Sequence, residues 1–388
     1  MNQPWIDQRA LEIAYLGLLF VLLLVPRLLQ RFRIPAPLSA FVLGIAAASG
    51  MDGLGADPTL GLLATFGISS LFLFAGLEVE KEAFSRGRWL LASHLAIRAL
   101  GLVLCAVLGA RYLDLAWQVA ALLGLALLTP STGFILDTLG QQGLDDHERF
   151  WVAAKAVAGE ILALAVLFVV VQSGSTGQFL LASGALLAIL AGLPLLFVLL
   201  GRHVLPHAPG TEFSMLLLVG LVAAYASKQL GVYYLVGAFL TGVVAKLLHE
   251  RMPQLASDRN LHAVRLFASF FVPFYFFHSG ARVPHEAFQW QSLALGLLLS
   301  AVVLPARIGV QWAHRRVMFK ESSDSSLRVA ITLVPTFIFT LVLAGILRER
   351  FGLPETWYGA LLVYAFVSTA LPSVLRGRQA AFDPARVA

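Results

Sequence analysis

The sequence is poor in charged residues and contains a single cysteine. Only 13% of its 388 residues are Asp, Glu, Lys or Arg, against about a quarter in soluble domains. Hydrophobic residues make up 59% of the chain and its mean hydropathy is +0.81. This composition excludes an ordinary soluble domain and predicts a membrane protein. The lone Cys105 also excludes an intrachain disulfide.

Motifs of catalysis and cofactor binding are missing as well. We find no metal-ligand cluster, nucleophile triad or phosphate-binding loop in the sequence, so we expect neither an enzyme nor a bound cofactor. The net charge of +6 could indicate nucleic acid, but its positive residues are dispersed through short connectors and are interpreted as topology signals. The first apolar run, 11–29, lacks a small-residue cleavage site and is expected to be retained as a spanning helix.

Apolar runs of about 20 residues are long enough to cross a bilayer as helices. The pattern predicts an all-α polytopic protein with thirteen such helices and no soluble domain left over. They are expected at 11–29, 37–50, 58–77, 89–110, 115–139, 148–172, 178–200, 211–227, 232–247, 264–281, 290–313, 327–347 and 356–375.

The distribution of positive charge predicts the orientation of these helices. With the N-terminus outside, 19 of the 28 Lys and Arg residues fall in inner segments, six in outer segments and three within helices. Inner connectors of membrane proteins are enriched in Lys and Arg. We therefore expect the N-terminus outside and the C-terminus in the cytoplasm, in a bacterial inner membrane.

Three short motifs recur in the same order along the chain. The pairs are AFVLGIAA (40–47) with AFLTGVVA (238–245), FLFAG (72–76) with YFFHSG (275–280), and LLTPST (127–132) with TLVPT (332–336), at offsets of 198, 204 and 205 residues. The members of each pair are seven predicted helices apart and so cross in opposite directions. This pattern predicts an inverted repeat of six plus six helices around a connector, which is typical of alternating-access transporters.

The third motif pair places a proline inside two predicted helices. Pro130 and Pro335 each remove one helix hydrogen bond, and the freed carbonyls need partners in lipid. One interpretation is a pair of ordinary proline kinks. The other, favoured by their matching repeat positions, is a pair of broken helices that present backbone groups to an ion. Hydroxyls beside the breaks would then bind the ion or cap the helices: Thr129, Ser131, Thr132 and Thr336.

Glu160 lies twelve residues into its predicted helix. At ~1.5 Å per residue this is roughly 18 Å deep, close to the middle of the bilayer. An unneutralised charge there costs several kcal/mol. Glu160 is either paired with Arg98 or Arg307, or it is a carboxylate that alternates between a proton and a cation.

Other charges are candidates to balance this site. Lys155 points about 140° away from Glu160; it either snorkels to the inner surface or lines an inner funnel. Arg98 and Arg307 lie within helices, and either could balance Glu160 or Asp137.

Several of these segments resemble one transporter family. LFLFAGLEVEKEAF, LTPSTGFILDTLG, GAFLTGVV and FVPFYFFHSGARV are similar to segments of the cation:proton antiporter-2 family, over about residues 34–375. The resemblance implies two crossing broken helices, a homodimer, and elevator-type transport of sodium or potassium against protons. Gly159-Glu160 stands where that family usually has Gln-Asp or Asp-Asp, and Arg307 matches its basic residue in the eleventh helix.

The resemblance and the helix count together predict the domain organisation. Scaffold and dimerisation helices are expected at 11–80 and 211–281, core transport helices at 89–172 and 290–375, and a linker helix at 178–200. Expected partners are a second copy of the chain, membrane lipid and, because no regulatory domain follows, a separate regulatory subunit.

We therefore predict a monovalent cation:proton antiporter, electroneutral because Glu160 stands without a second acid. Two alternatives stay open. The three intramembrane positive charges would suit a sodium-coupled organic-anion symporter, and the Gly159-Glu160 departure would permit a non-transporting sensor or subunit.

Overall fold

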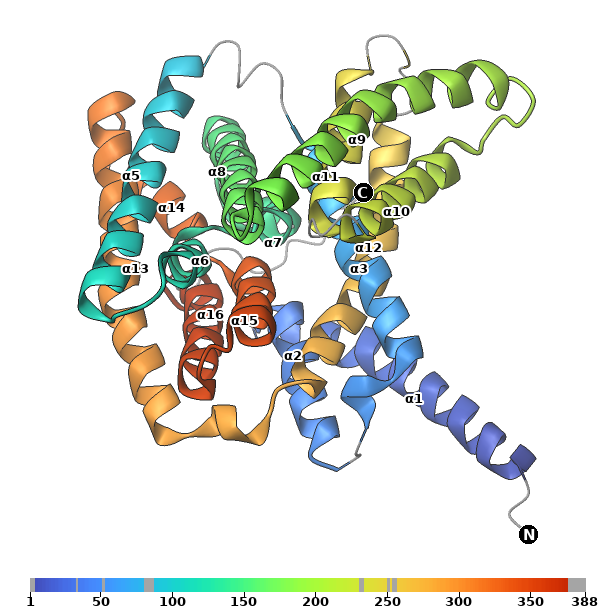
Figure 1. Cartoon of the computed structure of the whole chain (residues 1–388), viewed down its shortest axis with the longest axis horizontal. Helices are drawn as coiled ribbons and strands as arrows, with labels where there is room; N and C mark the ends of the chain where they lie inside the picture. Colours follow the sequence, from blue (N-terminus) through green and yellow to red (C-terminus); the bar gives the residue numbers. More distant parts are fainter. Residues whose placement is uncertain are drawn as a thin grey trace. The chain divides into compact units, whose positions relative to one another are not determined.

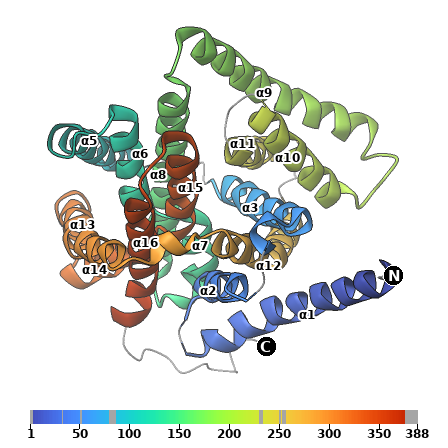
Figure 2. The same ribbon diagram turned by 60° about the horizontal axis from the view of Figure 1, so that its bottom comes forward.

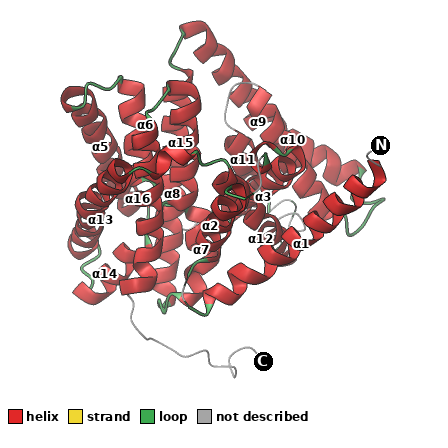
Figure 3. Cartoon of the chain, turned by 90° about the horizontal axis from the view of Figure 1, so that it is seen from below, coloured by secondary structure: helices red, strands yellow, loops and turns green. Residues whose placement is uncertain are grey.

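The structure is a computed structural model that describes residues 4–32, 34–50, 53–79, 87–229, 234–249, 252 and 257–375. Within these ranges the regular elements are helices, without a strand (Figure 3). Part of the evidence for orientation and family lies outside the described residues, namely the end of LFLFAGLEVEKEAF and Arg33, Lys81, Arg86, Arg251, Arg376, Arg378 and Arg386.

The chain divides into two compact units, and their helices are labelled in Figure 1. The first combines Met1–Leu71 with Arg265–Val283, and the second combines Phe72–Val264 with Pro284–Ala388. The first unit holds α1 (Pro4–Gln30), α2 (Ala36–Ala48), the start of α3 (Pro58–Leu77) and most of α12 (Asp258–Ala281). The second unit holds the end of α3, α5 (Arg88–Tyr112), α6 (Trp117–Leu128), α7 (Thr132–Thr138), α8 (Asp146–Gln172), α9 (Thr176–His203), α10 (Glu212–Gln229), α11 (Tyr234–Leu247), α13 (Trp290–Met318), α14 (Ser323–Thr332), α15 (Phe337–Phe351) and α16 (Glu355–Leu375).

Many of these helices are long and apolar enough to cross a membrane. By length and composition, the described residues contain eight such spans, or nine if α14 and α15 count as one bent span. Shorter apolar helices, among them α2 and the Leu235–Leu247 part of α11, make up further predicted segments. The count of thirteen stays a prediction.

Two predicted helices are interrupted at their prolines. The predicted helix 115–139 is α6 and α7, with Thr129, Pro130 and Ser131 between them, and the predicted helix 327–347 is α14 and α15, bent by 42°. Proline has no N–H and its ring clashes with the preceding turn. Each helix therefore ends before its proline and restarts after it.

The small-residue motifs bring helix backbones into close contact in the first unit. Gly44 of α2 faces the carbonyl of Phe277 in α12, and a Cβ at Gly44 would lie 2.0 Å from that oxygen. In return, a Cβ at Gly280 of α12 would lie 2.1 Å from the carbonyl oxygen of Phe41 in α2. Only glycine fits at these two positions, and the reciprocal contact locks α2 against α12.

The same reciprocal contact occurs in the second unit between α3 and α11. A Cβ at Gly76 of α3 would lie 2.2 Å from the carbonyl oxygen of Phe239, and a Cβ at Gly242 of α11 would lie 2.2 Å from that of Leu73. These four glycines belong to the first two repeated motifs. The motifs are therefore helix-packing sites of one kind, used once in each unit.

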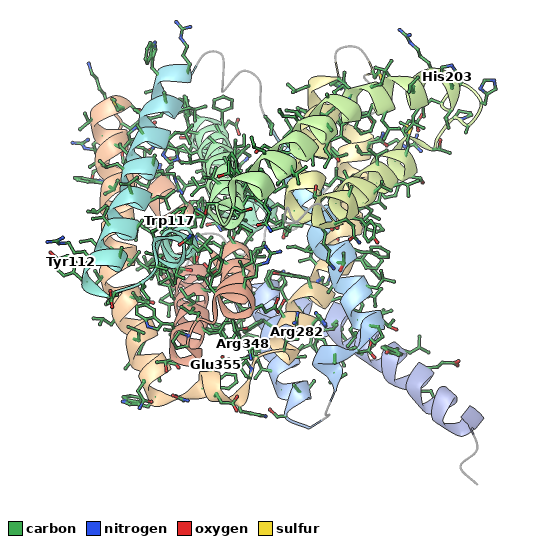
Figure 4. The ribbon with its side chains drawn as sticks, viewed as in Figure 1. Tyr112, Trp117, His203, Arg282, Arg348 and Glu355 are labelled. Carbon is green, nitrogen blue, oxygen red and sulfur yellow. The ribbon has the colours of Figure 1, made fainter. Side chains whose placement is uncertain are left out.

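Burial separates the core of the second unit from its lipid-facing surface. The span formed by α6 and α7 is 89% buried, whereas the span of α9 is only 11% buried. Tyr112 and Trp117 flank the connection from α5 to α6 and project outward (Figure 4). Such exposed aromatic rings are typical of the membrane–water interface. The broken helix is thus held inside the protein.

Candidate cation and proton site

The two helix breaks are in direct contact. The backbone N–H of Ser131 donates to the carbonyl of Pro335 over 2.8 Å. The Ser131 hydroxyl oxygen accepts hydrogen bonds from the N–H groups of Ile338, at 2.9 Å, and Phe339, at 3.3 Å. It thereby caps the start of α15, whose first N–H groups lack partners within the helix. Figure 2 shows α6, α15 and α16 gathered at this point.

An arginine binds the carbonyl end of the half-helix before each break. Arg98 of α5 donates from Nη1 to the carbonyl of Leu128, the last residue of α6, over 3.0 Å. Arg307 of α13 donates from Nη2 to the carbonyl of Leu333, just after α14, over 3.1 Å. The C-terminal end of a helix carries partial negative charge, which a guanidinium stabilises. Both arginines therefore stabilise backbone carbonyls at the breaks.

Helix α16 ties the two breaks together through Tyr364 and Ser368. The Tyr364 hydroxyl accepts from Arg307 Nη1 over 3.0 Å and donates to the carbonyl of Leu127 over 2.5 Å. The Thr336 and Ser368 hydroxyl oxygens are 2.9 Å apart. Sequence reasoning missed Tyr364 and Ser368. The available signal was that they are polar residues four apart, and hence on one face, in an otherwise apolar helix.

Glu160 is buried beside the first break. It is 2% exposed, and its Oε2 atom is buried without a hydrogen-bond partner. The hydroxyl of Thr132, the first residue of α7, lies within interaction range of the carboxyl, yet Thr132 Oγ1 is also buried without a hydrogen bond. Thr129, which directly follows α6, is buried as well. Two unpaired buried oxygens from different helices thus lie at the position predicted for the ion.

Gly159 makes room for Arg98 next to Glu160. A Cβ at this position would lie 3.3 Å from Cζ and Nη1 of Arg98, closer than ordinary van der Waals contact. The guanidinium is held in place by the Leu128 carbonyl and by His94 Nε2, which accepts from Arg98 Nε over 3.1 Å. Arg98 therefore occupies the space beside Gly159 that a second acidic side chain would need.

The structure corrects two predicted roles. Lys155 does not snorkel: it is fully buried, and its Nζ lies 3.1 Å from Nδ1 of His314. Arg98 and Arg307 are not paired with Glu160, since among the described residues the ion pairs formed do not include Glu160. Asp137, the other residue proposed for charge balance, is exposed near the end of α7.

The oxygen atoms at the breaks suit a monovalent cation better than a resident metal. Hard cations bind carboxylate, hydroxyl and carbonyl oxygens. In the described part of the chain, no group of three or more His, Cys, Asp or Glu residues could hold a metal ion. The site offers one carboxylate with hydroxyls around it, which can hold either a proton or a singly charged ion.

Comparison with known proteins identifies relatives over nearly the whole chain. The family model described as "Sodium/hydrogen exchanger, transmembrane" matches residues 18–377. A protein of Methanocaldococcus jannaschii named "Probable Na(+)/H(+) antiporter 3" is 27% identical over 361 residues, which cover 86% of this chain and 87% of that protein. The "Putative cation/proton antiporter YbaL" of Escherichia coli K12 is 26% identical, and the match covers 92% of this chain and 66% of that protein.

The fold is similar to that of a solved transporter. The structure of the sodium proton antiporter MjNhaP1 from Methanocaldococcus jannaschii at pH 8 aligns with a TM-score of 0.69 at 16% sequence identity, covering 94% of this chain and 96% of that one. An electron microscopy map of MjNhaP1 gives a TM-score of 0.67, also at 16% identity. At this identity the likeness shows the shared fold of the chain.

Proposed function

The chain belongs to the transmembrane sodium/hydrogen exchanger family, and we propose that it exchanges sodium or potassium for a proton with Glu160 as the coupling carboxylate. It is an integral membrane protein, and its family is one of transporters and not of enzymes. Thr129 and Thr132 supply oxygens to the ion, while Ser131 and Thr336 hold the broken helices in place.

The observation that carries this proposal is the buried Glu160, whose Oε2 atom has no hydrogen-bond partner, beside Thr132. A bare carboxylate inside a membrane protein is costly, and among the described residues Glu160 forms no ion pair. Protonated, it is neutral; with a monovalent cation bound, the pair is also neutral. Both loaded states can cross the membrane, whereas the empty state cannot. A carrier with these two loaded states exchanges one ligand for the other.

The same site favours a one-to-one exchange that moves no net charge. Gly159 and the Arg98 guanidinium leave room for one carboxylate and not two. One proton is then released for each cation bound. We further propose that residues 89–172 and 290–375 form the transport core, that residues 11–80 and 211–281 form a scaffold and homodimer, and that transport follows an elevator movement. The two reciprocal glycine contacts support an inverted repeat and a rigid scaffold.

The structure weakens the case for an organic-anion symporter. That alternative rested on three intramembrane positive charges. Arg98 and Arg307 are engaged by helix carbonyls and Lys155 by a histidine ring, so none of them is directed at an anion in the described structure. What remains beside the break is a carboxylate with hydroxyls, which favours a cation.

The test is cation-driven proton flux in proteoliposomes with a clamped membrane potential. Glu160→Gln mimics the permanently protonated state and should reduce exchange to background, while Glu160→Asp should keep part of it with an altered pH profile. The matched control is Glu286→Gln, at an exposed glutamate of the short helix before α13, which should exchange like the wild type. Undiminished flux in Glu160→Gln would remove Glu160 as the carrier, and a voltage generated by the wild type would remove the one-to-one ratio.

A further inference from the structure

A second buried titratable cluster lies on α8 five residues before Glu160. Lys155 is fully buried, and its Nζ contacts Nδ1 of His314 at 3.1 Å. Nε2 of His314 lies 2.9 Å from the Ser93 hydroxyl, which donates to the carbonyl of Leu90 over 3.0 Å. Three side chains from α8, α13 and α5 thus form one continuous hydrogen-bonded chain.

The hydrogen bonds between Lys155, His314 and Ser93 can form with or without one additional proton. With a charged Lys155, the ammonium donates to Nδ1 of a neutral His314, whose Nε2–H donates to the Ser93 oxygen. With a neutral Lys155 and the other tautomer of His314, the ring N–H donates to Nζ, and Nε2 accepts from Ser93. Both arrangements keep the Lys155–His314 and His314–Ser93 contacts, and in the second the Ser93 hydroxyl donates to Nε2 in place of the Leu90 carbonyl.

The charges that face Lys155 do not fix it in the protonated state. From α5 it faces Arg98 and His94, and from α13 it faces His314 and Arg315. The acidic group that acts on Lys155 is Glu321, which is already committed to Arg315 through a two-point ion pair and also contacts His147. Arg328 of α14 and Glu148 of α8 are paired with each other.

Among these groups, the Lys155–His314 pair can take up a proton more readily than its neighbour His94. His94 Nε2 accepts from Arg98 Nε, so protonation of that nitrogen would cost the Arg98 hydrogen bond. The Phe319 ring, 4.9 Å from Lys155 Nζ, offers partial compensation for an ammonium without a countercharge. Lys155 can therefore be protonated, but its surroundings do not hold it permanently in the charged state.

We propose that Lys155 and His314 form a second proton-binding site, and that a proton bound there weakens cation binding at Glu160. The inference rests on the proposed function of Glu160. This proton stays on the protein through the transport cycle, so it leaves the one-to-one exchange unchanged. It makes the transporter bind cation poorly when the surrounding solution is acid.

The coupling between the two sites is electrostatic and runs through a short path. Five residues of α8 separate Lys155 from Glu160, roughly 7.5 Å along the helix axis. The Arg98 guanidinium, which donates to His94, lies beside Gly159 on this path. A positive charge at this separation in a protein interior lowers the affinity for a cation about tenfold.

Opposite substitutions at Lys155 test the proposal. In proteoliposomes, the cation KM is measured at the acid and alkaline ends of the activity range. Lys155→Gln, which cannot take up a proton, should lower the KM about tenfold at the acid end and leave it unchanged at the alkaline end. Lys155→Arg, which is permanently charged, should raise the KM about tenfold at the alkaline end and leave the acid end unchanged. The kcat at saturating cation should stay that of the wild type.

A merely structural role would give another result. Both variants would then lose thermal stability and kcat together, with the dependence of KM on pH unaltered, and the proposal would be overturned. Should Lys155→Arg fail to fold, His314→Gln supplies the second arm: it removes the ring that shares the proton and should displace the pH at which KM changes. An unchanged profile in His314→Gln would count against the pair.

A titration separates this inference from the proposed function. Wild-type and Lys155→Gln protein in detergent are compared by potentiometric titration over the pH range of transport. The wild type should take up one proton more than the variant. Equal uptake would overturn the second site even if exchange is observed. Extra uptake in a wild type that exchanges no cation would keep the second proton site but refute its link to cation binding and the proposed function.

Discussion

The two helix breaks share a backbone arrangement but differ in what surrounds them. At each break, an arginine from another helix binds a carbonyl at the end of the preceding half-helix: Arg98 at α6 and Arg307 at α14. Arg307 is 9% exposed and is held by Tyr364, whereas Arg98 is half-buried and is held by His94. The second break bends its helix pair by 42°, while α6 and α7 together still meet the criteria for a single span.

This difference indicates that the two helix breaks have different roles. The break at Pro335 is anchored on all sides by buried hydrogen bonds, including the capping of α15 by Ser131. The break at Pro130 faces Glu160 and Thr132, whose oxygens are unpaired. Satisfied polar networks make a structure rigid, whereas a buried polar group without a partner is unusual and is free to accept a ligand. In the proposed mechanism the second break is therefore the support, and the first is the binding surface.

The largest effect on stability is expected from Arg307→Met. It leaves the Leu333 carbonyl without its donor and breaks the link through Tyr364 to α6. A lost hydrogen bond from a charged group costs about 1.5–3 kcal/mol, so the loss should be about 3 kcal/mol or more. Thermal unfolding in detergent measures it. Arg316→Met, at an exposed arginine of the same helix, is the control and should unfold close to the wild type.

Ser131→Ala should cost about 1–2 kcal/mol, because the first N–H groups of α15 lose their cap. Exchange activity should fall with it, since the cap aligns the two breaks. The control is Ser49→Ala, where an exposed hydroxyl bonds only within its own helix end. If Ser131→Ala were as stable and active as the control, the anchoring role of the second break would be lost.

Arg98→Met should cost less stability than Arg307→Met, about 1–2 kcal/mol, because the Leu128 carbonyl loses its donor while the Tyr364 link between the breaks stays in place. It should also lower the cation KM several-fold, since a positive charge beside Glu160 is removed. Flux assays at a fixed pH measure this. If the cation KM fell in Arg307→Met and not in Arg98→Met, the roles proposed for the two breaks would be contradicted.

The smallest effect is expected from Gly159→Ala. The new Cβ would press on the Arg98 guanidinium, yet alanine favours the helix by about 1 kcal/mol over glycine, so the net change should stay below about 1 kcal/mol. The same substitution should be more favourable in an Arg98→Met background, where the obstacle is gone. A double-mutant cycle of thermal stability reads this difference. Strict additivity would show that Arg98 does not press on position 159.

Much of this organisation could be predicted from the sequence because its signals are local. Pro130 and Pro335 interrupt their helices wherever they are placed, since proline has no N–H to donate. The repeated motifs could be found in the sequence as well, and four of their glycines lie at close helix contacts in the structure. The buried position of Glu160 followed from its depth in an apolar run. These inferences needed composition, spacing and the cost of polar groups in lipid.

Other features depend on which helices meet, and sequence distance carries little information about that. Arg98 and Arg307 were expected beside an acid, but carbonyls 30 and 26 residues away in sequence bind them instead. Tyr364 and Ser368 gained their roles only because α16 packs against both breaks. The sequence by itself determined that this protein spans a membrane with broken helices and one deep carboxylate, because each requirement acts within a single helix. Only the tertiary structure decided that Lys155 faces His314 and that Arg98 fills the space beside Gly159, because those contacts join helices whose packing depends on the whole fold.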